Sequence, residues 1–86
     1  MTYKEGIRLS KTDKGETVTV RGLCDMGRGI VGRLRDIGLT EGTPVICVGH
    51  SPIGGMSAYE IRGAVIALRK EDADTVLCDK TSGAGS

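Results

Sequence analysis

A glycine-rich segment is the first candidate for chemistry in this chain. Gly27-Arg28-Gly29-Ile30-Val31-Gly32 fits the pattern G-x-G-x-x-G and lies between a predicted strand and a predicted helix. That context can hold a dinucleotide pyrophosphate at a helix N-terminus. A dinucleotide fold also needs an acidic residue after its second strand to bind the ribose, and here that region reads Gly49-His50-Ser51-Pro52. We therefore interpret the glycines as a flexible connection that lets a helix pack closely on a sheet.

Cys47 and His50 form a second candidate, with Cys-x-x-His spacing. Residues three apart on a regular strand point to opposite faces, and no second ligand pair lies nearby in the sequence. We therefore expect no metal ligands and no cofactor. A domain that senses a metal through Cys or His remains the alternative, if Cys24 or Cys78 converges in space. The single histidine has no neighbouring carboxylate to orient it, so we predict no catalytic residues and no enzyme activity.

A loop and a helix face are the candidate partner-binding residues. The loop from Ser51 to Met56 is rich in turn-forming residues yet contains two large apolar ones. Exposed apolar groups on a loop are typical of a protein contact site. Arginines on the outer face of the predicted helix would supply a charged rim. The predicted partner-binding residues are Pro52, Ile53, Met56, Tyr59, Arg28 and Arg35.

The elements that must position these residues are mostly strands. Residues 17–23 alternate apolar and polar side chains, which predicts a half-buried strand. Residues 28–37 show helical periodicity, and Gly38 follows where a helix ends. The segment Thr43 to Gly49 is apolar on both faces, which favours a central strand covered on two sides. We also predict a short edge strand near Ile7 and Leu9, a hairpin from residues 58–62 and 64–69, a helical turn at 70–74 and a last strand at 75–79.

Length and composition restrict the function classes. The 86 residues carry 14 glycines, two tyrosines, no Trp or Phe, and a net charge of +1. One thin core fits such a chain, and the charge disfavours nucleic acid as a partner. The sequence lacks a signal peptide and an apolar run long enough to insert in a membrane, so we expect a soluble cytoplasmic protein. We predict one domain over residues 1–79, a small and partly open β-barrel, with a disordered tail at 80–86.

Several segments together resemble the FeoA family. These are Arg33-Leu34-Arg35-Asp36-Ile37-Gly38-Leu39-Thr40-Glu41-Gly42, Ser51-Pro52-Ile53-Gly54-Gly55, Arg62-Gly63 and Ala67-Leu68-Arg69. The same domain occurs at the C-terminus of iron-dependent repressors. The resemblance implies a mainly β fold, an SH3-like, partly open barrel of five to six strands with one inserted short α-helix. Where the family often has Asp and Pro after the Pro-x-Gly, this chain has Gly55-Met56-Ser57-Ala58.

The resemblance also implies a function. FeoA proteins are non-enzymatic cytosolic accessories to ferrous iron uptake, and they contact the cytosolic G-protein domain of the membrane transporter FeoB. A proline-rich peptide ligand is disfavoured, because an SH3 peptide groove needs an aromatic lining that this sequence lacks. An SH3-like domain that binds a transition metal directly is the alternative function. Self-association is left open by the sequence.

Overall fold

Six antiparallel strands form the main element of the described chain. The computed structural model describes residues 6–24 and 29–80. Short helical turns connect or cover the strands. In chain order the elements are β1 (Gly6–Arg8), a 3₁₀ turn (Leu9–Lys11), β2 (Thr17–Leu23), α1 (Val31–Asp36), β3 (Pro44–His50), β4 (Met56–Ile61), β5 (Ala64–Arg69), α2 (Lys70–Ala73) and β6 (Val76–Lys80).

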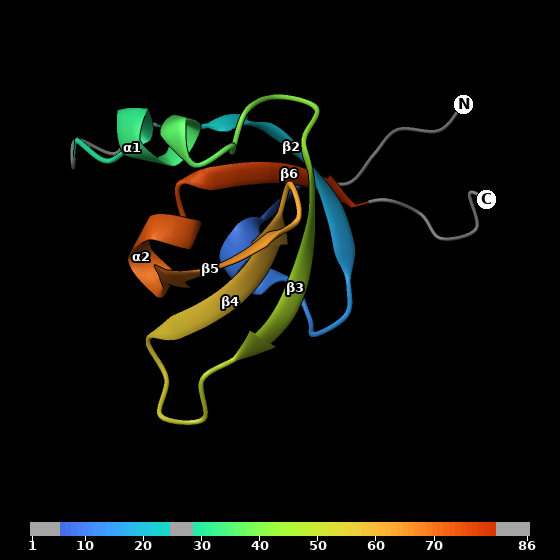
Figure 1. Cartoon of the computed structure of the whole chain (residues 1–86), viewed down its shortest axis with the longest axis vertical. Helices are drawn as coiled ribbons and strands as arrows, with labels where there is room; N and C mark the ends of the chain where they lie inside the picture. The colour runs from blue at the N-terminus through green and yellow to red at the C-terminus, as the bar shows by residue number, and fades with distance from the viewer. Residues whose placement is uncertain (1–5, 25–28, 81–86) are drawn as a thin grey trace.

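The strands form one strongly curved sheet in the order β1-β6-β2-β3-β4-β5 (Figure 1). β1 and β5 are the two ends of this sheet, so the barrel is open between them. The 3₁₀ turn and α2 contact each other, and α2 also contacts β5. They fill the opening. The predicted partly open barrel with one short inserted helix, α1, is confirmed.

The core comes from alternate residues of the strands. Val18 and Val20 of β2, Val45 of β3, and Val76 and Cys78 of β6 are all fully or almost fully buried. This period of two follows from the pleat, which sends successive side chains to opposite faces. Leu9, Leu34, Leu39, Cys47, Tyr59, Ile61, Leu68 and Ala73 complete the core.

Helix α1 ends at a glycine, as the sequence predicts. Gly38 has φ +109°, and its amide donates to the carbonyl of Arg35 at 3.0 Å. The amide of Leu39 donates to the carbonyl of Leu34, also at 3.0 Å. This bonding pattern is the Schellman motif, and it buries Leu39 directly after the helix.

The β4–β5 hairpin packs its turn against this helix end. Arg62 and Gly63 form the turn with φ of 53° and 85°, the two positive values that a type I′ turn requires. Arg62 was predicted as a strand residue, but Ile61 pairs with Ala64, so the strand ends before it. The Arg62 guanidinium donates to the hydroxyls of Thr40 and Thr43 at 3.3 Å. These hydrogen bonds connect the hairpin turn to the segment between α1 and β3.

Two predictions about strands need correction. β3 is covered on one face only: Val45 and Cys47 are buried, whereas Ile46 and Val48 are 37% and 40% exposed. The sheet curves around a single core, so an apolar run does not here indicate cover on both faces. β6 includes Lys80, which the sequence assigned to the tail, and residues 81–86 lie outside the described residues.

Because Gly38 lies close to Arg62, we predict that an alanine at Gly38 lowers the free energy of unfolding more than an alanine at Gly15 does. A Cβ at Gly38 would lie 2.9 Å from Cδ of Arg62 and 3.2 Å from Cγ2 of Ile61. Gly15 has a similarly positive φ of 86° but no atom within 4 Å of such a Cβ. We expect Gly15→Ala to lower the free energy of unfolding by about 1–2 kcal/mol through backbone strain alone. Gly38→Ala should cost at least about 1 kcal/mol more, because it adds a steric clash.

Urea denaturation of the two variants measures this difference. Equal losses of unfolding free energy would show that the hairpin turn does not constrain the end of α1. Adding Arg62→Ala to Gly38→Ala should recover part of the extra loss.

Candidate functional site

A shallow apolar groove lies on the outer face of the sheet, where β3, β4 and β5 run side by side. Its volume is about 320 Å³. Ala58 and Ala67 pair across β4 and β5, and their short side chains leave room between larger neighbours. Val48 and Met56, each 40% exposed, also line it. The remaining lining residues are Gly49, His50, Ser51 and Ser57.

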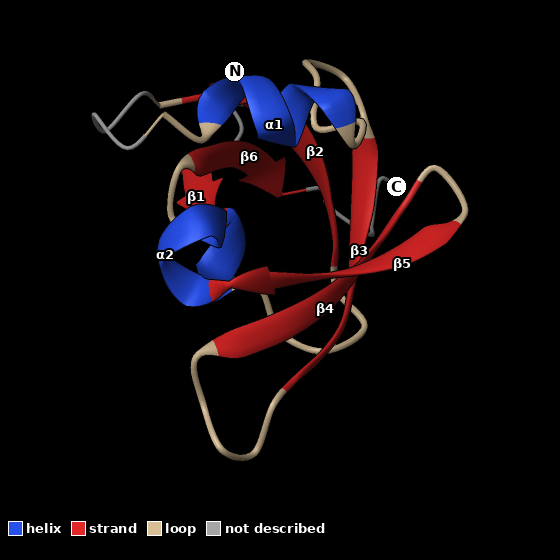
Figure 2. Cartoon of the chain, turned by 60° about the vertical axis from the view of Figure 1, so that its left-hand side comes forward, coloured by secondary structure: helices blue, strands red, loops and turns tan. Residues whose placement is uncertain are grey.

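The loop between β3 and β4 projects beyond the ends of these strands (Figure 2). Ser51 and Met56, where the loop begins and ends, line the groove. Its conformation is set by hydrogen bonds from the Ser51 amide to the Met56 carbonyl and from the Gly54 amide to the Ser51 carbonyl, both 2.9 Å. The side chain of Ile53 is 94% exposed. The loop therefore presents a large apolar side chain to solvent beside an apolar groove. The sequence led us to expect the exposed apolar group, but it gave no indication of the groove.

A second hollow, of about 260 Å³, adjoins the first. Met56 and Ala67 line both. The other walls come from α1 on one side and from β5 and α2 on the other, and they include Arg33, Arg69 and Asp72. The apolar groove therefore continues into a hollow with charged residues.

Two predicted partner-binding residues, Tyr59 and Arg35, do not lie at this surface. Tyr59 is fully buried, because alternation along β4 turns it toward the core, and its hydroxyl donates to the Leu9 carbonyl at 3.3 Å. Arg35 is exposed but lines a different hollow with Arg21 and Glu41. Arg28 lies outside the described residues. Among the helix arginines of the described chain, Arg33 is the one that lines the hollow shared with Met56.

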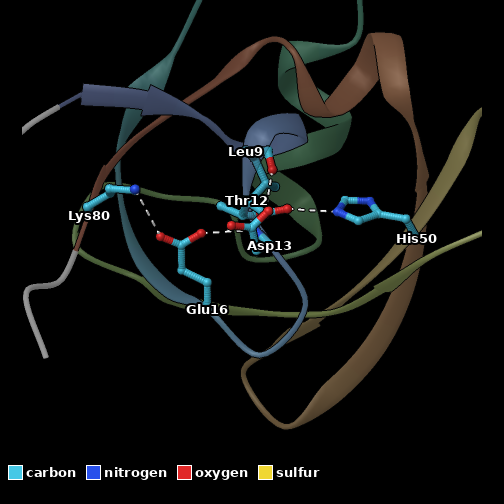
Figure 3. A network of polar contacts seen from close by, with 6 residues as sticks. All are labelled: Leu9, Thr12, Asp13, Glu16, His50 and Lys80. Carbon is cyan, nitrogen blue, oxygen red and sulfur yellow. Dashed lines mark hydrogen bonds and ion pairs between the residues drawn. The ribbon is translucent and has the colours of Figure 1, made fainter.

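A polar network holds the 3₁₀ turn against the end of β3 (Figure 3). The buried hydroxyl of Thr12 donates to the carbonyl of Leu9 at 2.7 Å. Nε2 of His50 donates to the carbonyl of Thr12, also at 2.7 Å, while Nδ1 lies 2.5 Å from the Ser57 hydroxyl. The sequence gave no reason to connect Thr12 and Ser57 to His50, since they come from three separate segments.

Cys47 and His50 lie closer together than a regular strand allows. The pairing between β3 and β4 shifts between Cys47 and Gly49, so Val48 is an extra residue that bulges out. Sγ of Cys47 consequently lies 3.7 Å from Nε2 of His50. The prediction that the two side chains point apart is wrong. Gly49 inside the strand was the signal that could have revealed the bulge.

The other thiols have different environments. Cys78 is fully buried, and this burial, with the nearby Asp79 carboxylate as a smaller cause, raises the pKa of its thiol to about 12. Burial likewise raises the pKa of Tyr59. Cys24 is partly exposed. Within residues 6–24 and 29–80, no three His, Cys, Asp or Glu side chains gather as a metal-binding group.

The sheet topology removes the dinucleotide interpretation of the glycine-rich segment. β2, which precedes the segment, pairs antiparallel with both β3 and β6. A dinucleotide fold needs parallel strands joined by a crossover helix. Within the described residues, no helix is long and apolar enough to cross a membrane.

Comparison with protein-family models decides the family. The model of the FeoA domain matches residues 7–80. The chain belongs to the FeoA family. This match includes all of the strands described above except Gly6, the first residue of β1. A comparison with curated protein sequences gave no match.

Solved structures of FeoA proteins have the same fold. A FeoA-like protein from Clostridium acetobutylicum is 27% identical, with a TM-score of 0.82 over 94% of this chain and 92% of that one. FeoA of Stenotrophomonas maltophilia, determined in complex with zinc, is 28% identical, with a TM-score of 0.76 over 85% of this chain and 89% of that one. It is described as a prokaryotic SH3 domain protein and a proposed ferrous iron transport activating factor, and the SH3-like fold is thereby confirmed.

A transcriptional repressor that depends on manganese shares the fold alone. Its identity is 17%, and its TM-score of 0.81 extends over 94% of this chain but only 45% of the repressor. The sequence resemblance to the C-terminal domain of metal-dependent repressors is thus supported at the level of fold.

The buried thiol predicts a loss of stability in alkali. The pKa of Cys78 is raised on folding from 9.0 to about 12, so the folded chain retains a proton that the unfolded chain loses. Its contribution is fully present below pH 9 and is lost as the pH rises toward 12. We expect the urea midpoint to fall over this range. In Cys78→Ala the urea midpoint should fall less between pH 9 and 10. This range lies below the pH at which the buried Tyr59 begins to affect stability.

Cys24→Ala is the control, because Cys24 is partly exposed. If its pH profile flattened as much as that of Cys78→Ala, burial of Cys78 would not be the cause.

Proposed function

We propose that this FeoA protein is a cytoplasmic accessory to ferrous iron uptake that acts by binding the cytosolic G-protein domain of a FeoB transporter. Membership of the FeoA family and the similarity to a proposed iron transport activating factor support the iron uptake part. The sequence resemblance suggests FeoB as the partner. The groove and the loop beside it form the surface that we propose binds this partner. The module needs no catalytic group for this role.

The observation that carries the proposal is the uncovered apolar surface around Met56. Ile53, Val48 and Met56 expose large apolar side chains at one end of the sheet. Full burial of one such side chain contributes roughly 1.5–3 kcal/mol, or about 10- to 150-fold in affinity. A surface that includes Ile53 at 94% exposure can therefore supply a strong anchor for a protein partner.

The same surface does not resemble a proline-rich peptide groove. Such a groove stacks prolines on exposed aromatic rings. The chain has no Trp or Phe, and Tyr59 is fully buried in the core. Aliphatic side chains make up the apolar part of the surface, which favours a folded partner with a complementary apolar patch.

Arg33 and Arg69 make the charged edge of the proposed interface. Both line the hollow that continues from the groove through Met56. Exposed arginines at the edge of an interface increase the rate of association with an acidic partner more than they change the affinity. We therefore expect the docking surface of the transporter domain to be acidic beside its apolar patch.

Charge introduced in the apolar surface should weaken the complex. We expect Met56→Asp and Ile53→Asp each to raise the Kd for the FeoB cytosolic domain at least tenfold, because each would desolvate a carboxylate in an apolar contact. Val65→Asp is the matched control. Val65 is 62% exposed but pairs with Glu60, whereas Met56 pairs with Arg69 at the opposite end of the hairpin.

Binding should be measured with the purified FeoB cytosolic domain, with and without guanine nucleotide. Iron uptake should be measured separately, in cells. Unchanged binding and uptake in folded Met56→Asp and Ile53→Asp variants would remove this surface from the proposal. A complete lack of binding by the parent protein under all nucleotide conditions would remove the partner.

Arg33 and Arg35 lie on the same helix but line different hollows, so we predict that charge reversal at each has a different effect on the association rate. Arg33→Glu should slow association with the transporter domain and reverse its salt dependence, while Arg35→Glu should have a smaller effect because it lines a separate hollow. Stopped-flow measurements at several salt concentrations test this. A larger effect of Arg35→Glu would place the charged edge on the other side of α1.

A further inference from the structure

The contact between Cys47 and His50 has the dimensions of a metal site. A tetrahedral transition-metal ion holds a thiolate sulfur at about 2.3 Å and an imidazole nitrogen at about 2.0–2.1 Å, which places the two ligand atoms about 3.6 Å apart. Sγ of Cys47 and Nε2 of His50 are 3.7 Å apart. An ion could bridge them with almost no change in their separation.

The carbonyl of Thr12 is placed to be a third ligand. It lies 2.7 Å from Nε2 of His50 and accepts a hydrogen bond from it. A carbonyl oxygen can only accept, so Nε2 carries the proton when no metal is bound. An ion bound to Nε2 would replace that proton, and the carbonyl could coordinate it once the N···O separation widens from 2.7 Å to about 3.4 Å.

Ser57 allows the imidazole to change tautomer without losing its second contact. The hydroxyl of Ser57 lies 2.5 Å from Nδ1 of His50. A hydroxyl can donate to Nδ1 in the metal-free protein and accept from Nδ1–H when Nε2 binds a metal. Such a hydrogen bond to the second ring nitrogen is the usual support of a metal-binding histidine.

We propose that Cys47 Sγ, His50 Nε2 and the Thr12 carbonyl form a binding site for a borderline transition-metal ion such as Zn²⁺ or Co²⁺. Thiolate and imidazole together select this class of metal over Mg²⁺ or Ca²⁺. The Cys47 thiol loses its proton to solvent on binding, while the imidazole proton moves from Nε2 to Nδ1, so one proton is released for each ion bound.

The site is suited to reversible binding. Two side chains and one carbonyl leave the fourth position of a tetrahedral ion open to water or to another molecule. His50 is exposed, so an ion reaches the buried sulfur from the side of the imidazole ring. This site is independent of the transporter contact proposed above, although His50 also lines the groove.

Titration of the reduced protein with Co²⁺ tests the proposal. We expect one ion per chain, a thiolate-to-cobalt charge-transfer band, and release of one proton, measured by calorimetry in buffers of different ionisation enthalpy. Cys47→Ala should abolish the band. Ser57→Ala should weaken binding about 10- to 100-fold, as expected for loss of a group that orients a ligand.

Cys78→Ala and Cys24→Ala are the matched controls. Cys78 is as buried as Cys47, and both controls lie away from the single histidine in sequence. Both variants should keep the band. If Cys47→Ala does not fold, His50→Gln serves instead: its side-chain amide can still donate to Thr12, yet it is a poor metal ligand, so cobalt binding should be lost. Absence of a band in the parent, its survival in Cys47→Ala or His50→Gln, or its loss in Cys24→Ala would overturn the proposal.

Discussion

The carbonyl of Leu9 is the acceptor on which the closure of the barrel depends. It is buried and receives hydrogen bonds from the Thr12 hydroxyl at 2.7 Å and the Tyr59 hydroxyl at 3.3 Å. Leu9 follows β1 and Tyr59 belongs to β4, so the Tyr59 bond joins distant parts of an open sheet, while the Thr12 bond is local and holds the 3₁₀ turn. A buried carbonyl without a partner would cost about 1–3 kcal/mol. The same turn fixes the Thr12 carbonyl, and through it the position of His50.

Local sequence signals predicted most of the fold and less of the site. The alternation in residues 17–23 and the stop at Gly38 act within a few residues, and both are confirmed. The bulge at Val48 depends on the register between β3 and β4, which no local pattern fixes, whereas the inward position of Tyr59 follows from the alternation along β4. The exposure of Val48 was not predicted, because an apolar run does not show whether another element covers that face of the strand. The contacts of Thr12 and Ser57 with His50 connect segments 38 and 7 residues away in sequence, and only the folded chain brings them together.

The bulge in β3 shapes both surfaces of interest. The extra residue, Val48, turns its apolar side chain into the groove, and the strand beyond it is rotated so that His50 faces back toward Cys47. One local irregularity thus produces an apolar contact surface and a cysteine–histidine pair on neighbouring parts of the same strand. Bulges commonly occur where a strand must re-aim a side chain for function. His50 is the residue that these two features share, because it also lines the groove.

The position of β6 affects how the chain can fold during synthesis. β6 is made after every other described strand, yet it lies between β1 and β2, with Gly6 opposite Asp79 and Val20 opposite Cys78. Until residues 76–80 leave the ribosome, β1 has no partner and β2 exposes an unpaired edge. The β3–β4–β5 meander can form earlier, because its contacts are local. In a nascent chain the barrel would therefore be incomplete and its apolar interior exposed to solvent. Chaperones protect intermediates of this kind from aggregation.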